Sequence, residues 1–255
     1  MRHFLFAALV AVFAGPLSLQ AAEGPVYEMR VYTCEPGKLD ALNERFQNHT
    51  MRIFEKHGMK NIAYWTPTDG ETAATTLIYI LEHQSREAAK DSWDAFRNDP
   101  EWKQVAKESQ EKHGKILAKA PESTYMVATD YSPKTASPHT GRIYELRTYT
   151  AADGKIDNLN ARFRDHTDKI FQRHGMRALG YWQPTDGEAA NNTLIYVLGY
   201  ESRDAAREAW KAFGADPEWQ AAWKASEENG KLLATRPGSV YMQLTDYSPV
   251  SPANE

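Results

Sequence analysis

Three polar residues alternate along a short segment near the start of the chain, in an order that could support chemistry. Glu28, Arg30 and Tyr32 stand two positions apart, so in an extended strand their side chains share one face. The same residue types recur at Glu145, Arg147 and Tyr149. Because buried charges are costly unless they are paired, each set is either a structural ion pair or a polar anchor for a ligand carboxylate, carbonyl or hydroxyl.

A histidine falls on the apolar stripe of a predicted helix in each half of the chain. His49 follows Phe46 and precedes Ile53 at steps of three or four residues, which places it on the helix face turned toward a sheet. Its counterpart is His166. Such a histidine is either a hydrogen-bonded core residue, or a pocket acid or base, or a haem ligand, because imidazole titrates near neutral pH and binds metals.

Two further histidines stand at predicted helix ends. His57 and His174 each precede a glycine, at a position where the helix dipole favours a histidine. His49 and His57 are too far apart in sequence for the paired histidines of a zinc-binding helix, and no acidic ligand stands at metal spacing. The sequence therefore predicts no metal site.

Aromatic residues are frequent and recur in both halves of the chain. They include Trp65, Tyr79 and Trp93, with counterparts at Trp182, Tyr196 and Trp210. Most are expected in the core, while a minority near His49 would line an apolar cavity with a few polar groups, as a small-molecule pocket requires. The chain carries no nucleophile motif, phosphate-binding loop, dinucleotide fingerprint or paired-cysteine signature.

The whole chain consists of two copies of one sequence, which decides its architecture. Tyr27-Glu28-Met29-Arg30 recurs as Tyr144-Glu145-Leu146-Arg147, and Asp130-Tyr131-Ser132-Pro133 recurs as Asp246-Tyr247-Ser248-Pro249. Two long copies are too few for a solenoid. We expect two homologous domains at 26–133 and 143–249, joined by a linker at 134–142 and followed by a tail at 250–255.

Each copy alternates β-rich segments with helical periodicity. In the first copy the pattern predicts strands at 26–33, 60–66, 75–82 and 123–131. It predicts helices from Pro36 to about His57, after Ser85, and from Pro100 to about Leu117. The order β-α-β-β-α-β is the ferredoxin-like arrangement of an α+β fold. Since helices cover only one face of such a sheet, the two copies are expected to pack sheet to sheet as an intramolecular barrel.

Composition and the chain ends restrict the partners. The 255 residues include 30 Lys+Arg and 34 Asp+Glu, a net charge of −4, which argues against nucleic acid because phosphate binding needs clustered basic residues. The single cysteine, Cys34, excludes a disulfide framework. Residues 1–22 have the layout of a signal peptide. We therefore expect an exported protein, periplasmic or secreted, with no membrane attachment after cleavage.

The repeated motifs resemble the NIPSNAP family. The resemblance rests on Tyr-Glu-Met/Leu-Arg in the first strand, His-Gly-Met at the helix end, Tyr-Trp before the hairpin and Asp-Pro-Glu-Trp late in each copy. It implies a dimeric α+β barrel, a fold shared with cofactor-free monooxygenases, chlorite dismutases and dye-decolourising peroxidases. It implies no defined catalytic activity, and this chain is similar to an exported bacterial member with two tandem domains.

Three functions are compatible with these residues. The first is a module that binds a small, partly apolar ligand in each half, without a cofactor. The second is an oxygenase or other oxidoreductase for aromatic or quinol-like substrates, in which Trp65, Tyr79 and His49 position substrate and move protons. The third is a scaffold whose function lies on its surface. Haem is the alternative to a cofactor-free site through fold kinship alone, and a homo-oligomer is compatible with all three.

Overall fold

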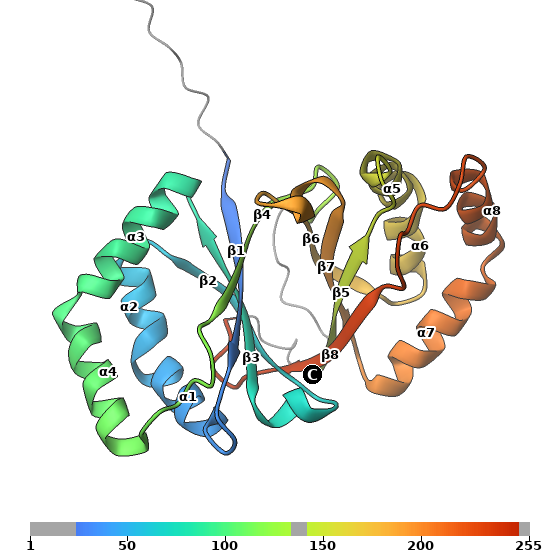
Figure 1. Cartoon of the computed structure of the whole chain (residues 1–255). Helices are drawn as coiled ribbons and strands as arrows, with labels where there is room; N and C mark the ends of the chain where they lie inside the picture. Colours follow the sequence, from blue (N-terminus) through green and yellow to red (C-terminus); the bar gives the residue numbers. More distant parts are fainter. Residues whose placement is uncertain (1–23, 134–141, 250–255) are drawn as a thin grey trace, which may run out of the picture.

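The computed structural model describes residues 24–133 and 142–249. The predicted signal peptide (1–22), nearly all of the predicted linker (134–142) and the predicted tail (250–255) lie outside the described residues. The described chain forms two similar halves, each with its helices on the outside and its strands turned toward the other half (Figure 1).

The first half has the expected order of elements, with short additional helical turns. Its strands are arranged β4-β1-β3-β2 and all neighbours are antiparallel. Its elements are β1 (Val26–Thr33), α1 (Leu39–Arg45), the π-helical turn η1 (Phe46–Thr50), α2 (Met51–Lys56), β2 (Lys60–Pro67), η2 (Glu71–Ala74), β3 (Thr76–His83), α3 (Arg86–Asn98), α4 (Pro100–His113) and β4 (Glu122–Ala128).

The second half repeats this order, and its strands are arranged β8-β5-β7-β6. Its last helix, α8, is shorter than the counterpart α4. The elements are β5 (Ile143–Thr150), α5 (Ile156–Arg162), η3 (Phe163–Thr167), α6 (Asp168–Arg173), β6 (Arg177–Pro184), η4 (Glu188–Asn191), β7 (Thr193–Tyr200), α7 (Arg203–Ala215), α8 (Pro217–Ser226) and β8 (Gly238–Leu244).

The two sheets join edge to edge into one closed barrel of eight strands. Strand β2 pairs with β8, with Trp65 opposite Leu244, and β4 pairs with β6, with Met126 opposite Pro184. The two sheets were expected to pack face to face. They are also hydrogen-bonded to each other along two seams, β2–β8 and β4–β6. Closure leaves no free sheet edge, which is the usual way for a β-sheet to avoid edge-to-edge association.

Three separate hydrophobic cores follow from this arrangement. One lies inside the barrel, and one lies beneath the helices of each half. Successive strand residues point to opposite faces, so Tyr64 packs under the helices whereas Trp65 points into the barrel. The barrel interior is occupied by large side chains, including Trp65, Ile78, Ile80, Tyr144, Trp182 and Ile195.

Each half ends in a segment that docks on the other half. Tyr131 packs against the ring of Tyr181, with centroids 5.2 Å apart, and its hydroxyl donates to Asn160 Oδ1 at 2.8 Å. The Oγ atom of Ser132 accepts the backbone N–H of Tyr181 at 3.0 Å. Tyr247 and Ser248 make the corresponding contacts on the first half. The repeated Asp-Tyr-Ser-Pro motif thus joins the halves beyond the barrel strands.

The sequence predicted the starts of α3 and α4 correctly and the ends of α4 and β4 incorrectly. Ser85 and Asp99 cap α3 and α4 through side-chain acceptors, as expected. The prediction that the α4 helix continues to Leu117 was wrong, because Gly114 adopts a φ of 67° and ends the helix after His113. Strand β4 stops at Ala128 rather than 131, since the following residues dock on the other half.

Gly180→Ala is expected to lower the free energy of unfolding by about 1–3 kcal/mol, the usual cost of overpacking a core. A methyl group built at Gly180 would overlap the indole ring of Trp182, so the ring or the strand must move. Gly199→Ala is the matched control, because the nearest atom to a methyl group there, in the ring of Tyr144, is 3.5 Å away. Urea unfolding of both variants checks the prediction, and an equal effect in the two would contradict it.

Candidate functional site

The first repeated polar set forms a fully satisfied carboxylate centre beneath the helices. Glu28 is 0% exposed, and its Oε1 accepts from Arg30 Nη1 and Ser123 Oγ, both at 2.6 Å. Its Oε2 accepts from Trp93 Nε1 at 2.6 Å and lies 3.1 Å from His83 Nε2. The Arg30 guanidinium also stacks over the Trp93 ring, 4.3 Å from its centroid. These contacts are those of a structural ion pair.

The second half builds the same centre with one substitution. Glu145 accepts from Arg147 at 2.8 Å, Ser239 at 2.5 Å and Trp210 at 2.8 Å. The hydroxyl of Tyr200 donates to Glu145 Oε2 at 2.7 Å, in the place that His83 takes in the first half. The repeat of four contacts in both halves indicates a shared role in holding the sheet to its helices.

The electrostatics of Glu28 follow from its partners. Burial by itself would raise the pKa of the carboxyl, but the hydrogen bond from His83, the charge of Arg30 and the hydrogen bonds from Ser123 and Trp93 outweigh it. Together they lower the pKa of Glu28 to about 2. The pKa of Arg30 is raised in turn, although burial opposes its charge, by neighbouring tyrosines and by Glu28.

Acidification is expected to remove the stabilisation that Glu28 provides. The carboxyl has a pKa of about 2 in the folded chain against an ordinary 4.5, so its contribution is complete above about pH 4.5. It is lost as the pH falls through about 2, and amounts to about 3 kcal/mol. Urea unfolding of wild type and Glu28→Gln from pH 6 to pH 2 checks this. The stability difference between them should shrink with acid, and a constant difference would contradict the assignment.

The two helical histidines do not lie where the sequence predicted. His49 is half-buried at the outer surface and His166 is exposed, whereas Thr50 and Thr167 take the buried positions. The cause is a π-helical turn in each helix, which inserts one residue into the helical repeat. The Thr50 hydroxyl donates to the Arg45 carbonyl, five residues earlier, at 3.1 Å. Neither histidine faces the sheet.

The predicted aromatic pocket is also not formed. Trp65 and Trp182 point into the barrel, whereas Tyr79 lies in the core beneath the helices of its half. The predicted grouping of Trp65, Tyr79 and His49 is therefore wrong, because the three side chains lie in different parts of the fold. Tyr79 instead neighbours Tyr32, with ring centroids 5.4 Å apart. In the second half, Tyr149 and Tyr196 form the equivalent pair.

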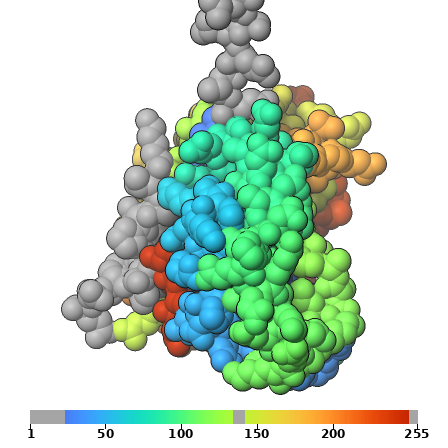
Figure 2. All heavy atoms as spheres, turned by 90° about the vertical axis from the view of Figure 1, so that its left-hand side faces the viewer, coloured from blue at the N-terminus to red at the C-terminus, as the bar shows by residue number. Residues whose placement is uncertain are grey.

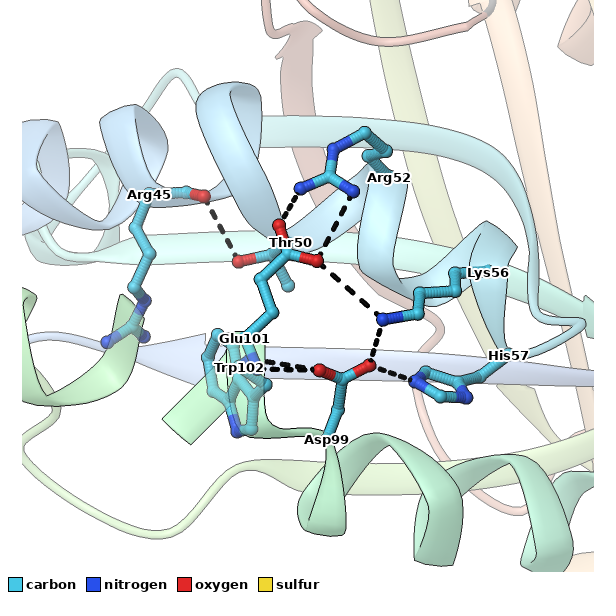
Figure 3. Close-up of polar contacts among 8 residues, drawn as sticks. All are labelled: Arg45, Thr50, Arg52, Lys56, His57, Asp99, Glu101 and Trp102. Atoms are coloured by element: carbon cyan, nitrogen blue, oxygen red, sulfur yellow. Dashed lines mark hydrogen bonds and ion pairs between the residues drawn. The ribbon is translucent and has the colours of Figure 1, made fainter. Parts of the chain in front are cut away.

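The helix-end motifs form a joint between α2 and α4 (Figure 3). Asp99 Oδ1 accepts the backbone N–H groups of Glu101 and Trp102, while its Oδ2 lies 2.7 Å from Lys56 Nζ and 2.6 Å from His57 Nε2. The hydrogen bonds from Lys56 and His57 hold the pKa of Asp99 well below its usual range. Asp216 repeats this joint with His174 and Arg173. His-Gly-Met and Asp-Pro-Glu-Trp thus have a structural role in each half.

A cleft of about 200 Å³ lies between the first helix (α1 with the turn η1) and α4 of the first half. We call it the first-half cleft. Figure 2 shows these helices side by side on one face of the molecule, the first in blue and α4 in green. Glu44 and Lys112 form an ion pair of 2.8 Å between the two helices. The residues that line the cleft include Ala41, Arg45, His49, Val105, Ser109 and Lys112, together with the carboxylates of Glu44 and Glu108.

Arg45 is the cleft residue whose charge lacks a partner. Its guanidinium makes no hydrogen bond or ion pair within the described residues, and its Nε atom is buried. Figure 3 shows this guanidinium apart from the Asp99 joint. It lies over the Trp102 ring, 5.5 Å from the centroid. Burial lowers the pKa of Arg45, and the groups that oppose this effect are two tyrosines and Cys34 rather than a carboxylate.

Sequence reasoning missed Arg45 and also Ser109, whose Oγ is buried without a partner in the described part of the chain. A usable signal was present, because both recur at the same offset as the other motifs, as Arg162 and Ser226. A repeated arginine next to a repeated phenylalanine in a buried helix face would have marked the position.

Within residues 24–133 and 142–249, no group of three or more His, Cys, Asp or Glu side chains could hold a metal ion. The surroundings of His49 do not fit a haem, because a cleft of about 200 Å³ is smaller than the roughly 300–1,000 Å³ of drug-sized ligand pockets. None of the helices in these ranges is both long and apolar enough to cross a membrane.

The geometry defines a class of α+β proteins in which two homologous halves close one eight-stranded barrel beneath external helices. The family model described as NIPSNAP matches residues 27–133 and 144–249. The chain therefore belongs to the NIPSNAP family, with two tandem domains. Among curated proteins, none matches this chain.

Several solved structures are similar to this chain at low sequence identity. A proposed monooxygenase from Lactobacillus acidophilus is 12% identical with a TM-score of 0.55, covering 87% of this chain and 94% of that chain. A proposed monooxygenase from Fusobacterium nucleatum is 13% identical with a TM-score of 0.55, covering 87% and 92%. A NIPSNAP domain protein from Burkholderia xenovorans is 17% identical with a TM-score of 0.37, covering 43% and 99%. At these identities the first two structures show a shared fold and carry no activity.

Proposed function

We propose that this protein binds a small anionic organic molecule in the first-half cleft, with Arg45 as the group that recognises its charge. The observation that carries the proposal is the unpaired Arg45 guanidinium, since buried charges in proteins are normally paired. An arginine remains charged even when burial lowers its pKa. An anion entering the cleft would supply the missing counter-charge and accept the guanidinium N–H groups.

The dimensions and walls of the cleft support a small and partly apolar ligand. Ala41 and Val105 contribute apolar wall, and both are nearly completely buried. The Ser109 hydroxyl adds one polar group beside Arg45. A few polar groups on an apolar wall are the usual composition of a small-molecule site. The sequence predicted a ligand in each half of the chain. We propose instead a ligand in the first half.

Binding is favoured over oxygenase chemistry by the position of the aromatic residues. The fold is shared with proteins proposed to be monooxygenases, but the grouping that would position a substrate is absent. Trp65 lies inside the barrel, and Tyr79 is covered beneath the helices. The Glu28 centre is already satisfied by internal donors, so it is not offered as a ligand anchor.

Arg45→Gln is expected to weaken the binding of small anions at least tenfold, since it removes the unpaired guanidinium from the cleft. Amide chemical shifts of labelled protein, followed during titration with acetate, benzoate, sulfate and phosphate, measure this. At least one anion should shift resonances of cleft residues such as Ala41 and Val105. Lys90→Gln, on the exposed face of α3, is the control with retained binding. Absence of any anion-dependent shift in wild type would refute the proposal.

A further inference from the structure

The two halves place the same arginine and serine at one position but surround them differently. In the second half, Arg162 Nη1 donates to Ser226 Oγ at 3.2 Å, and Arg162 is only 5% exposed. In the first half, Ser109 Oγ and the Arg45 guanidinium have no such bond to each other or to other described residues. The same pair is therefore closed by internal contacts in one half and left open to a cleft in the other.

The second half also carries a carboxylate at this position. Glu227 directly follows Ser226 at the end of α8, and its Oε1 accepts the backbone N–H of Leu232 at 3.4 Å. Burial lowers the pKa of Arg162, and the groups that oppose this effect are Tyr149, then the negative charge of Glu227, and Tyr196. Glu227 is therefore a nearby negative charge on the second half's own chain, without an ion pair to Arg162 among the described residues.

The first half has no carboxylate at the equivalent position, and its helix is longer. Helix α4 continues to His113, so the residue after Ser109 remains in the helix. That residue is Gln110, which is neutral and exposed. The groups that favour the charged form of Arg45 are the hydroxyls of Tyr32 and Tyr79 and the thiol of Cys34. The first half keeps the arginine and the serine without a carboxylate at the position of Glu227. The carboxylates in its cleft wall are Glu44, which pairs with Lys112, and Glu108.

We infer that the ligand of the first-half cleft is a small ionised carboxylic acid, bound once per chain, and that the negative charge of Glu227, next to Ser226, makes such a ligand unnecessary in the second half. This inference rests on the proposed function. A planar guanidinium matches a carboxylate through two parallel hydrogen bonds. One guanidinium with one hydroxyl suits a single negative charge. A phosphate dianion would keep an uncompensated charge in a partly buried site whose wall also holds the carboxylates of Glu44 and Glu108.

Titration with benzoate, benzamide and inorganic phosphate tests the ligand class in the full chain. One benzoate is expected to bind per wild-type chain, with benzamide and phosphate at least tenfold weaker. Arg45→Gln should weaken benzoate at least tenfold and Ser109→Ala about three- to tenfold. Arg162→Gln, at the closed position, is the matched control and should leave benzoate binding unchanged. The milder Ser109→Ala variant keeps the test usable if Arg45→Gln does not fold.

Removing the internal carboxylate tests the comparison between the halves. Glu227→Ala is expected to create a second benzoate site per chain, lost again when Arg162→Gln is added. If Glu227→Ala still binds a single benzoate, or if wild type binds two, the inference is overturned. Phosphate binding as tight as benzoate, and dependent on Arg45, would overturn the carboxylate assignment while the proposed function stands. If none of the probes binds at Arg45, both fail together.

Discussion

Glu28→Gln is expected to lower the free energy of unfolding by about 3–5 kcal/mol, the usual cost of removing one partner from a buried ion pair. The Arg30 guanidinium is only 15% exposed at its side chain and would be left without its counter-charge. The new amide NH₂ group would also face donors, since Ser123, Trp93 and Arg30 all donate to the carboxylate. Chemical denaturation at pH 7 measures the loss.

The chain offers a neutral control and a repeat of this experiment. Glu122→Gln removes an exposed carboxylate at the start of β4, paired with Lys119 at the surface, and should change stability by less than about 0.5 kcal/mol. Glu145→Gln should destabilise strongly as well, because three donors and Arg147 surround it. A loss below about 1 kcal/mol for Glu28→Gln would instead favour a ligand-anchoring role for this carboxylate.

Repetition made the architecture predictable from the sequence. The offset between the copies, together with alternating strand and helix patterns, predicted two α+β halves facing each other, and the eight-stranded barrel agrees at this level. Caps at Ser85 and Asp99 could be recognised because they depend on residue type and local spacing. The hydrogen-bonded seams between the two sheets could not be predicted, because pairing between strands far apart in sequence leaves no local pattern.

Side-chain orientation was predicted well in strands and poorly in the first helix. The alternation of Glu28 and Arg30 gave the correct shared face, since a strand repeat of two residues leaves little room for error. His49 was misplaced because one inserted residue in the π-helical turn brings Thr50, rather than His49, onto the buried face of the helix. A prediction from helical periodicity assumes an unbroken α-helical repeat, and the residue types at 46–50 do not indicate a π-helical turn.

The first half expressed alone, as residues 24–133, is expected to form a dimer and no stable monomer. Without the second half, β2 loses β8 and β4 loses β6, so both sheet edges are unpaired. The inward face carries large apolar side chains, among them Trp65 and Met126, which would meet water. Because β8 is the counterpart of β4 and β6 of β2, two copies can close the same barrel around a twofold axis. Light scattering after size exclusion measures the mass.

A charge inside the barrel separates this dimer from non-specific association. Ile80 is 1% exposed and points into the barrel, so Ile80→Asp in the half-chain should abolish the dimer through the cost of burying a carboxylate. Lys90→Asp on the exposed face of α3 should leave it intact. A folded half-chain monomer at micromolar concentration would show that each half is stable alone. The barrel seams and the Tyr131 contacts would then join two independent domains rather than complete a single fold.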